Sequence, residues 1–181
     1  MQENLGLNQR VPTTWVLVAD DKQAEIFSYS KSVHALPKGG ANRHHYYDER
    51  SGHELTPVAN GILMAESIDD YQLGHNRRGS SSSSNSPTHN TYEPHGDINT
   101  ELKRRFAKAI IGKLRQSCTE KLFDRLVFVA PGKMIGELKE QMSSDMQNRI
   151  AVCLPKDLTH FHGQELVEHL SGILTENHIN S

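Results

Sequence analysis

Hydrophobic residues occur along the chain in short runs of two kinds, separated by polar stretches. Residues 14–19 (TWVLVA) are apolar or β-branched throughout, which predicts a strand buried on both faces. Residues 24–29 (AEIFSY) alternate apolar and polar side chains, as half-buried strands do. Asp20 and Asp21 lie between the two runs, so we predict a β-hairpin whose turn uses these side chains.

The stretch that follows has weaker patterns. Residues 37–53 are rich in Gly, Asn, His and Tyr and predict a loop, whereas residues 54–59 fit a third strand. Residues 63–71 fit a strand or a short helix equally. Residues 74–96 are nearly free of aliphatic side chains, and residues 80–84 are all serine. Such a segment buries too little apolar surface to offset the entropy of ordering it, so we predict a disordered insertion.

A strong amphipathic helix is predicted to begin at Asp97 or Asn99, where Asn99 and Thr100 supply a cap. One face of this helix is apolar at every fourth position, and we expect this face to pack on the sheet. It consists of Leu102, Phe106, Ile110 and Leu114, with Ala109 beside them. The opposite face is basic and carries Arg104, Lys108 and Arg115.

The rest of the chain alternates strand and helix. Strands are predicted at residues 124–130 and 149–154, and helices at residues 133–142 and 163–175. A helix between consecutive strands implies parallel pairing with right-handed crossovers. Together with the hairpin, this predicts an α/β fold with a mixed sheet, in which an antiparallel β-hairpin is followed by an αβαβα run.

The predicted elements belong to one domain. Within the 181 residues, we assign residues 14–176 to a single α/β domain that carries the Ser-rich insertion at residues 74–96. Residues 1–13 form a flexible N-terminus, and residues 177–181 form a tail.

Composition narrows the class of protein. The net charge is −2 and the isoelectric point about 6.6, so any contact with nucleic acid has to come from a local patch. No apolar stretch approaches the ~20 residues of a membrane span, and residues 1–10 lack the hydrophobic run of a signal peptide. Cys118 and Cys153 are the only cysteines, which fits a reducing compartment. We therefore expect a cytoplasmic protein without membrane contact.

Three groups of residues resemble the bacterial host attachment protein family, which is described as required for attachment to host cells. They are residues 15–20 (WVLVAD) with 24–27 (AEIF), residues 106–107 with 123–131 (FDRLVFVAP) and 136–139 (GELK), and residues 156–160 (KDLTH). The last two groups are the more specific, because KDLTH directly follows a strand in that family. The resemblance covers residues 14–170, with the insertion matching in position only.

That family is in turn similar to the middle domain of archaeal and eukaryotic class-1 peptide release factors, which has an RNase H-like fold. Release factors carry Gly-Gly-Gln on a mobile loop, placed to promote hydrolysis of peptidyl-tRNA. The corresponding residues 74–96 contain no Gly-Gly-Gln. The resemblance thus implies an RNase H-like, release-factor-type scaffold that keeps a translation-related role without the catalytic motif.

Basic residues around the start of the long helix are the strongest binding candidates. Arg77 and Arg78 lie on the predicted arm, and the helix adds Lys103, Arg104, Arg105 and Lys108. A mobile arm beside a basic helical face suits contacts with the phosphates of RNA or of the ribosome. The competing interpretation is a solvated helix face beside a linker, since no aromatic residues interleave with the basic ones to stack on bases.

A second candidate is the family motif at the end of the last predicted strand, where α/β folds gather functional groups: Lys156, Asp157, Thr159 and His160. The alternative, which we favour, is a structural turn. In that interpretation Asp157 and Thr159 satisfy backbone donors and position the last helix.

Catalytic and metal-binding patterns are weak. Asp20 ends the first strand, where RNase H-type nucleases place a metal-binding carboxylate, but a two-metal site needs several converging acids. Neither Asp124 nor Glu137 is placed to complete such a set. The chain has 11 histidines, and none shows the spacing of a zinc site. We expect no metal and no cofactor.

Two functions remain open. The first is a non-enzymatic binding protein of the host-attachment type that contacts RNA, the ribosome or another protein. The alternative is a hydrolase acting on peptidyl-tRNA or nucleic acid, in which Asp20 or residues 156–160 contribute. The missing Gly-Gly-Gln favours the first. A role as an adhesin at the cell surface conflicts with the absence of a leader.

Overall fold

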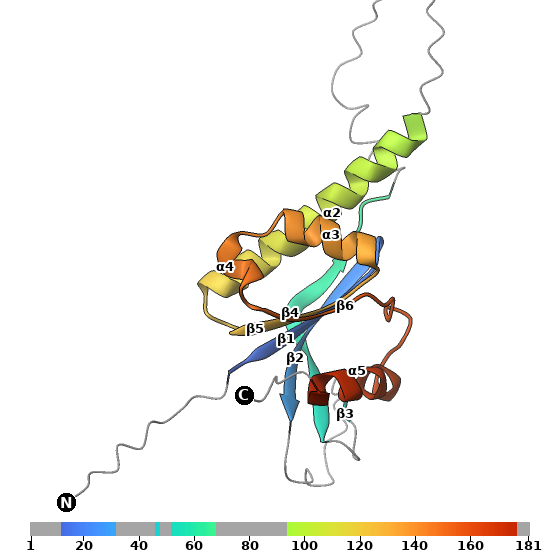
Figure 1. Ribbon diagram of the computed structural model, residues 1–181. Coiled ribbons are helices and arrows are strands. Elements are labelled where there is room, and N and C mark those ends of the chain that lie inside the picture. The colour runs from blue at the N-terminus through green and yellow to red at the C-terminus, as the bar shows by residue number, and fades with distance from the viewer. Residues whose placement is uncertain (1–11, 32–45, 48–51, 68–93, 177–181) are drawn as a thin grey trace, which may run out of the picture.

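The computed structural model describes residues 12–31, 46–47, 52–67 and 94–176 (Figure 1). Within them, six strands form one mixed sheet in the order β3-β4-β2-β1-β5-β6. The strands are β1 (Thr14–Ala19), β2 (Gln23–Lys31), β3 (Tyr46–Tyr47), β4 (His53–Met64), β5 (Arg125–Val129) and β6 (Ile150–Leu154). The helices are α2 (Pro94–Thr119), α3 (Gly132–Glu140), α4 (Ser144–Gln147) and α5 (Gln164–Glu176).

One half of the sheet is antiparallel. β1 pairs with β2 from Thr14↔Tyr29 to Ala19↔Ala24, so the predicted hairpin is confirmed. All six residues of β1 are buried, as its continuous apolar run predicted. The third predicted strand is confirmed as β4, which pairs with β2 and extends to Met64.

β4 contains a four-residue bulge where it pairs with β2. Glu25 pairs with Ile62 and Phe27 with Pro57, so residues 58–61 lie opposite one residue of β2. Asn60 adopts a φ of 55° in this bulge. A Cβ on Gly61 would lie 2.8 Å from the carbonyl oxygen of Val58, so the bulge requires glycine there.

The other half of the sheet is parallel. β1 pairs with β5, and β5 with β6, both in parallel. α2 precedes β5, and α3 and α4 connect β5 to β6. The alternation of strand and helix therefore predicted the direction of the β5–β6 pairing correctly, and the mixed α/β fold is confirmed.

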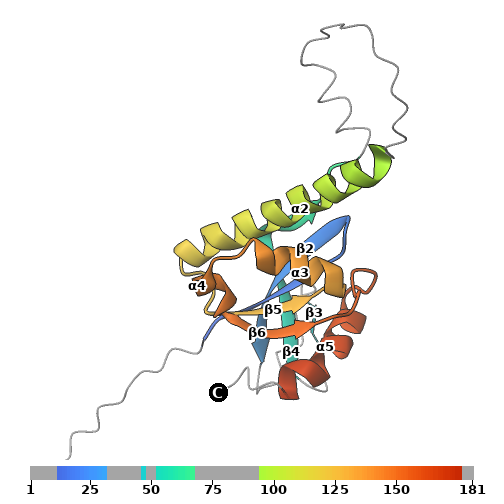
Figure 2. The same ribbon diagram turned by 45° about the horizontal axis from the view of Figure 1, so that its top comes forward.

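Helices cover both faces of the sheet, as Figures 1 and 2 show from two directions. α2, α3 and α4 lie on one face and α5 on the other. β1 supplies both cores because its side chains alternate: Trp15 and Leu17 pack under α2 and α3, whereas Val16 and Val18 pack under α5. The ring centroids of Trp15 and Phe123 lie 5.0 Å apart in the first core.

Two local predictions were wrong, and two short elements were missed. α2 begins at Pro94 rather than at Asp97 or Asn99, because proline at the first helical position removes no intrahelical hydrogen bond. Ala109 is exposed, and its neighbours Ala107 and Ile111 complete the buried face instead. The short helix α4 was not predicted, although its Met146 is buried. β3 and the first residue of β4, His53, lie in the stretch at residues 37–53 that was predicted to be a loop.

Residues 74–93 of the predicted insertion lie outside the described residues, as do residues 1–11 and 177–181. The last three residues of that insertion, 94–96, belong to α2, so the disorder predicted for them is wrong. The domain limits therefore stay predictions. In the part of the chain that the structure describes, no helix combines the length and the apolar character needed to cross a bilayer.

Candidate functional site

The face of α2 that points away from the sheet is basic. Arg104, Lys108 and Arg115 are exposed, whereas Phe106 and Ile110 on the opposite side are at most 3% exposed. The apolar stripe predicted from the sequence is confirmed, and it fixes the rotation of the helix about its axis. We call Arg104, Lys108 and Arg115 the basic face of α2.

Ion pairs divide the predicted basic residues into two groups. Lys103 lies 3.0 Å from Asp21, and Arg105 pairs with Glu101 at 3.1 Å and Glu66 at 3.8 Å. Both side chains therefore already have an acidic partner within the fold.

The basic face has fewer partners. Arg104 has a long contact of 3.7 Å with Glu101, and its side chain is 70% exposed. Lys108 and Arg115 form no side-chain ion pair with any described residue. Arg77 and Arg78 lie outside the described residues. Arg104, Lys108 and Arg115 on the basic face are thus better able to bind an external anion than Lys103 and Arg105.

A shallow groove of about 510 Å³ runs between α2 and α3. The basic face of α2 forms one wall, and Glu137, Glu140 and Gln141 form the other. Gly112 also lines the groove, and a Cβ built there would meet nothing within 4 Å. Glycine inside a helix costs about 1 kcal/mol relative to alanine, so Gly112 weakens the helix without a packing reason.

The acidic wall of the groove was not predicted. Glu137 and Glu140 are three residues apart and share one face of α3, a pattern that the sequence contains. Sequence alone did not show that this face lies opposite the basic face of α2, because that depends on how the two helices pack.

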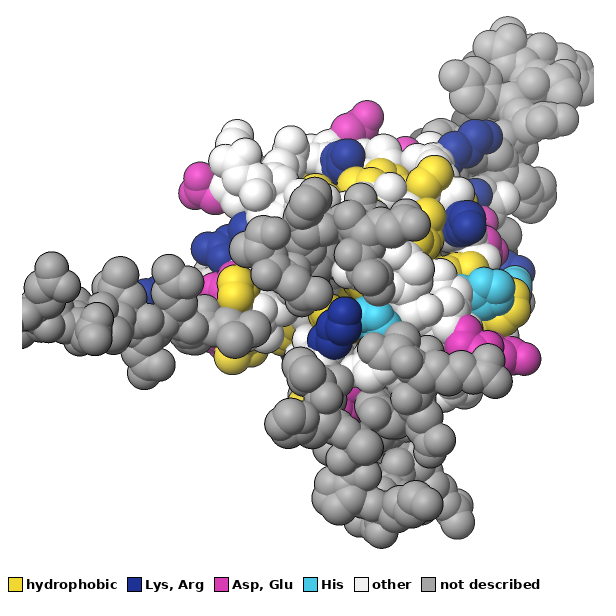
Figure 3. All heavy atoms as spheres, turned by 60° about the horizontal axis from the view of Figure 1, so that its bottom comes forward, with side chains coloured by type: hydrophobic (Ala, Val, Ile, Leu, Met, Phe, Trp, Pro, Cys, Tyr) yellow, Lys and Arg dark blue, Asp and Glu magenta, His cyan; other side chains and the backbone are white. Residues whose placement is uncertain are grey.

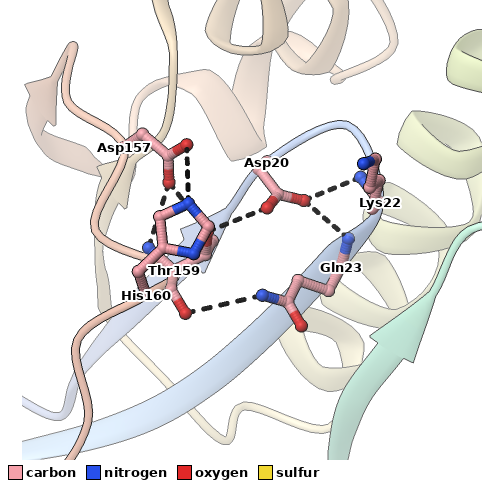
Figure 4. Close-up of polar contacts among 6 residues, drawn as sticks. All are labelled: Asp20, Lys22, Gln23, Asp157, Thr159 and His160. Atoms are coloured by element: carbon pink, nitrogen blue, oxygen red, sulfur yellow. Dashed lines mark hydrogen bonds and ion pairs between the residues drawn. The ribbon is translucent and has the colours of Figure 1, made fainter.

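The second candidate site lies at the carboxyl ends of the parallel strands, where Asp20 holds the β1–β2 turn (Figure 4). Its Oδ1 accepts hydrogen bonds from the backbone N–H groups of Lys22 and Gln23, both at 2.7 Å. Its Oδ2 lies 2.8 Å from the hydroxyl oxygen of Thr159. The predicted role of Asp20 in the hairpin turn is confirmed, and both carboxylate oxygens are engaged within the protein.

Asp157 and Thr159 form a local turn in the segment between β6 and α5. Asp157 Oδ1 accepts a hydrogen bond from the Thr159 backbone N–H at 3.1 Å and lies 2.7 Å from the Thr159 hydroxyl oxygen. A hydroxyl group carries one hydrogen, so Thr159 donates to Asp157 or to Asp20 at any moment. We call these three residues the aspartate–threonine clasp. It ties the segment before α5 to the β1–β2 turn.

The rest of the family motif surrounds the clasp. Leu158 is 4% exposed and packs in the core under α5. Lys156 is exposed, and His160 Nε2 lies 3.8 Å from Asp157 Oδ2 with its side chain 77% exposed. These are the contacts of the structural turn that the sequence favoured.

A pocket of about 590 Å³ borders the clasp at this edge of the sheet. Basic and acidic side chains both line this pocket. The basic ones are Lys22, Lys103 and Lys133, the acidic ones are Asp20, Asp21, Glu137 and Asp157, and His160 lies beside them. No group of three or more His, Cys, Asp or Glu among the described residues is arranged to hold a metal ion. The converging acids that a two-metal nuclease needs are therefore not found in the described part of the chain.

The surface elsewhere is also mixed in charge. In the coloured part of the face shown in Figure 3, basic and acidic side chains intermingle, and hydrophobic side chains form small separate groups. This agrees with the net charge of −2. The basic face of α2 is therefore a local feature and not part of a general positive field.

The fold and the site define a class: a mixed α/β domain whose strand-end residues are held in internal contacts and whose long helix presents an exposed basic face. The model of the family described as "Protein required for attachment to host cells" matches residues 15–170. The chain belongs to that family, as the residues singled out in the sequence suggested. The comparison with curated proteins gave no match.

Proposed function

We propose that this protein is a non-enzymatic binding protein that contacts RNA or the ribosome through the basic face of α2. The observation that carries the proposal is the position of Lys108 and Arg115, which are exposed and have no ion pair with any described residue. Exposed cations on a rigid helix bind phosphate groups with little loss of helix order, because the helix is already fixed by its apolar side.

The shape of the groove supports the same function. Gly112 leaves open space between Lys108 and Arg115, so a phosphate backbone has room to approach the helix closely. The acids Glu137 and Glu140 repel phosphates from the far wall. A bound strand would therefore run along the outer side of α2.

The scaffold also agrees with the proposal. An antiparallel unit of β4, β2 and β1 continued by the parallel strands β5 and β6 is compatible with the RNase H-like, release-factor-type domain that the resemblance implies. In such a domain, a basic helix follows the mobile loop. In this proposal the protein is cytoplasmic and affects attachment to host cells indirectly.

The hydrolase alternative gains no support from the described residues. Asp20 uses both carboxylate oxygens in the clasp, and residues 156–160 form the turn that holds it. An attacking group or a metal would have to displace these contacts.

The proposal is tested by binding of the full chain to a single-stranded RNA and to purified ribosomes, measured by fluorescence anisotropy and co-sedimentation. The parent is compared with the double variant Arg104→Gln, Lys108→Gln, which leaves the apolar stripe intact. The matched control is Lys31→Gln, Lys139→Gln, which removes the same charge from exposed positions that do not line the groove.

We expect the control to bind like the parent. The double variant should bind at least tenfold more weakly, because each lost phosphate contact lowers the binding free energy by about 0.7 kcal/mol or more. Equal binding by the parent and the double variant contradicts the assignment of the basic face. A parent that binds neither RNA nor ribosomes at low salt contradicts the proposed partner.

A further inference from the structure

A small pocket opens between β2, β4 and the segment before α5, on the other face of the sheet from α2. Its volume is about 50 Å³. Most of its lining is apolar, and its titratable side chains are Glu25 and His162. The apolar lining includes Val18, Phe27, Ile62, Leu158, Phe161 and Leu166.

Glu25 is the unusual residue in this pocket. Its side chain is half-buried, and the carboxylate has no hydrogen bond or ion pair with any described residue. Burial raises the pKa of Glu25 above its ordinary value, and the nearby His162 opposes that shift. A partly desolvated carboxylate that is offset only by the exposed His162 lowers the stability of the fold, which makes it a candidate for a binding function.

The rim of the pocket is exposed and apolar. Ile62 belongs to β4, lies beside Glu25 in the β2–β4 pairing and is 67% exposed. The bulge at residues 58–61 separates Ile62 from the regular part of β4, so the position of this side chain is set by the required glycine at Gly61. An isoleucine at the entrance favours a ligand with an apolar stem.

We propose that this Glu25 pocket binds an alkylammonium group, with the ammonium against the Glu25 carboxylate and the methylene stem against Ile62 and Phe27. The carboxylate selects a cation, since an anion would add a second negative charge in the same apolar surroundings. One carboxylate is too few ligands for a divalent metal ion. This site is independent of the basic face of α2.

The volume sets the size of the ligand. A bound water needs roughly 10–15 Å³, so a pocket of about 50 Å³ admits roughly four groups of that size. An ammonium and about three methylene groups fit this limit, so the pocket admits the end of a lysine side chain or of a short primary amine, with the rest of the stem against Ile62 at the rim. A nucleotide or a larger cofactor does not.

The test uses n-butylammonium chloride and the uniformly ¹⁵N-labelled full chain at pH 8, where fewer imidazole groups are charged and compete for the carboxylate. The backbone amide shifts of Glu25, Ile62 and His162 are followed by NMR. We expect saturable shifts with a dissociation constant on the order of 1 mM, as suits a ligand of about five non-hydrogen atoms. n-Butanol and sodium chloride, tested separately, control for the stem and for ionic strength.

The variant Glu25→Gln keeps the size of the side chain and removes its charge, so we expect affinity for n-butylammonium to fall at least about tenfold. Glu165→Gln, in the first turn of α5 and exposed, is the matched control and should bind like the parent. If Glu25→Gln does not fold, Glu25→Asp, which withdraws the carboxylate by one methylene group, should also weaken binding. No saturable shift in the parent, equal binding of n-butanol, or undiminished binding by the Glu25 variants overturns the proposal.

Discussion

Thr159 shows how one hydroxyl can hold two distant parts of a chain. It lies within 2.8 Å of Asp20 and 2.7 Å of Asp157, and the contact with Asp20 joins residues 139 positions apart. The sequence indicated that Asp20 closes a turn and that Asp157 and Thr159 satisfy local donors. It did not indicate that the two turns meet, because that contact depends on the order of strands in the sheet.

Thr159→Val removes the hydroxyl and keeps the shape of the side chain, so we expect a loss of about 1–3 kcal/mol in the free energy of unfolding. The buried carboxylate oxygen of Asp20 then lacks its side-chain donor. Denaturant unfolding measures the effect. Thr119→Val, whose hydroxyl bonds to an exposed backbone carbonyl at the end of α2, should change stability by less than about 0.5 kcal/mol. A Thr159 variant as stable as this control would show that the clasp adds nothing.

Tyr29 gives a pH-dependent prediction. Its hydroxyl lies 2.6 Å from His53 Nδ1, and burial raises its pKa from 10.0 to about 12. The folded protein therefore keeps this proton at pH values where the unfolded chain has lost it. The contribution of Tyr29 to stability is complete below pH 10 and is lost as the pH rises toward 12.

The measurement is an alkaline unfolding series of the parent and of Tyr29→Phe. The parent should lose more stability than the variant between pH 10 and pH 12. Parallel loss of stability in both proteins across this range would show that Tyr29 titrates alike in the folded and unfolded states.

At the scale of elements, hydrophobic periodicity predicted the elements that bury a long apolar face and missed the short ones. The stripe around Phe106 and the apolar run of β1 are long enough for packing to reinforce the pattern. The two-residue strand β3 and the four-residue helix α4 are too short to show a period. The start of α2 at Pro94 was missed because its first turns carry no apolar pattern.

Phe106→Ala tests the packing of α2. Phe106 is 3% exposed at the centre of the stripe, and truncation of such an aromatic side chain costs about 3–5 kcal/mol. Arg104→Ala, on the opposite face, should stay within about 0.5 kcal/mol of the parent. Thermal or denaturant unfolding of both variants checks this, and equal stabilities would mean that the helix does not pack through Phe106.

At the scale of the whole molecule, the sequence predicted the class of fold and the parallel pairing of β5 and β6, because a helix between consecutive strands implies a crossover between parallel strands. The parallel pairing of β1 with β5 was not predicted. The sequence also did not predict which helices share a face of the sheet. That choice places α3 beside α2 and so creates the groove whose two walls carry opposite charge. The basic residues were therefore predicted from the sequence. Which of them form an ion pair within the fold was not.

The central claim is that the basic face of α2 binds a phosphate backbone, and the salt dependence of RNA binding tests it most directly. The logarithm of the association constant is measured against the logarithm of salt concentration for the parent, for Arg104→Gln and for Lys108→Gln. Each single variant should reduce the steepness of this line by about 0.7–0.9, the value for one phosphate contact. Lines of unchanged slope for both variants would contradict the claim.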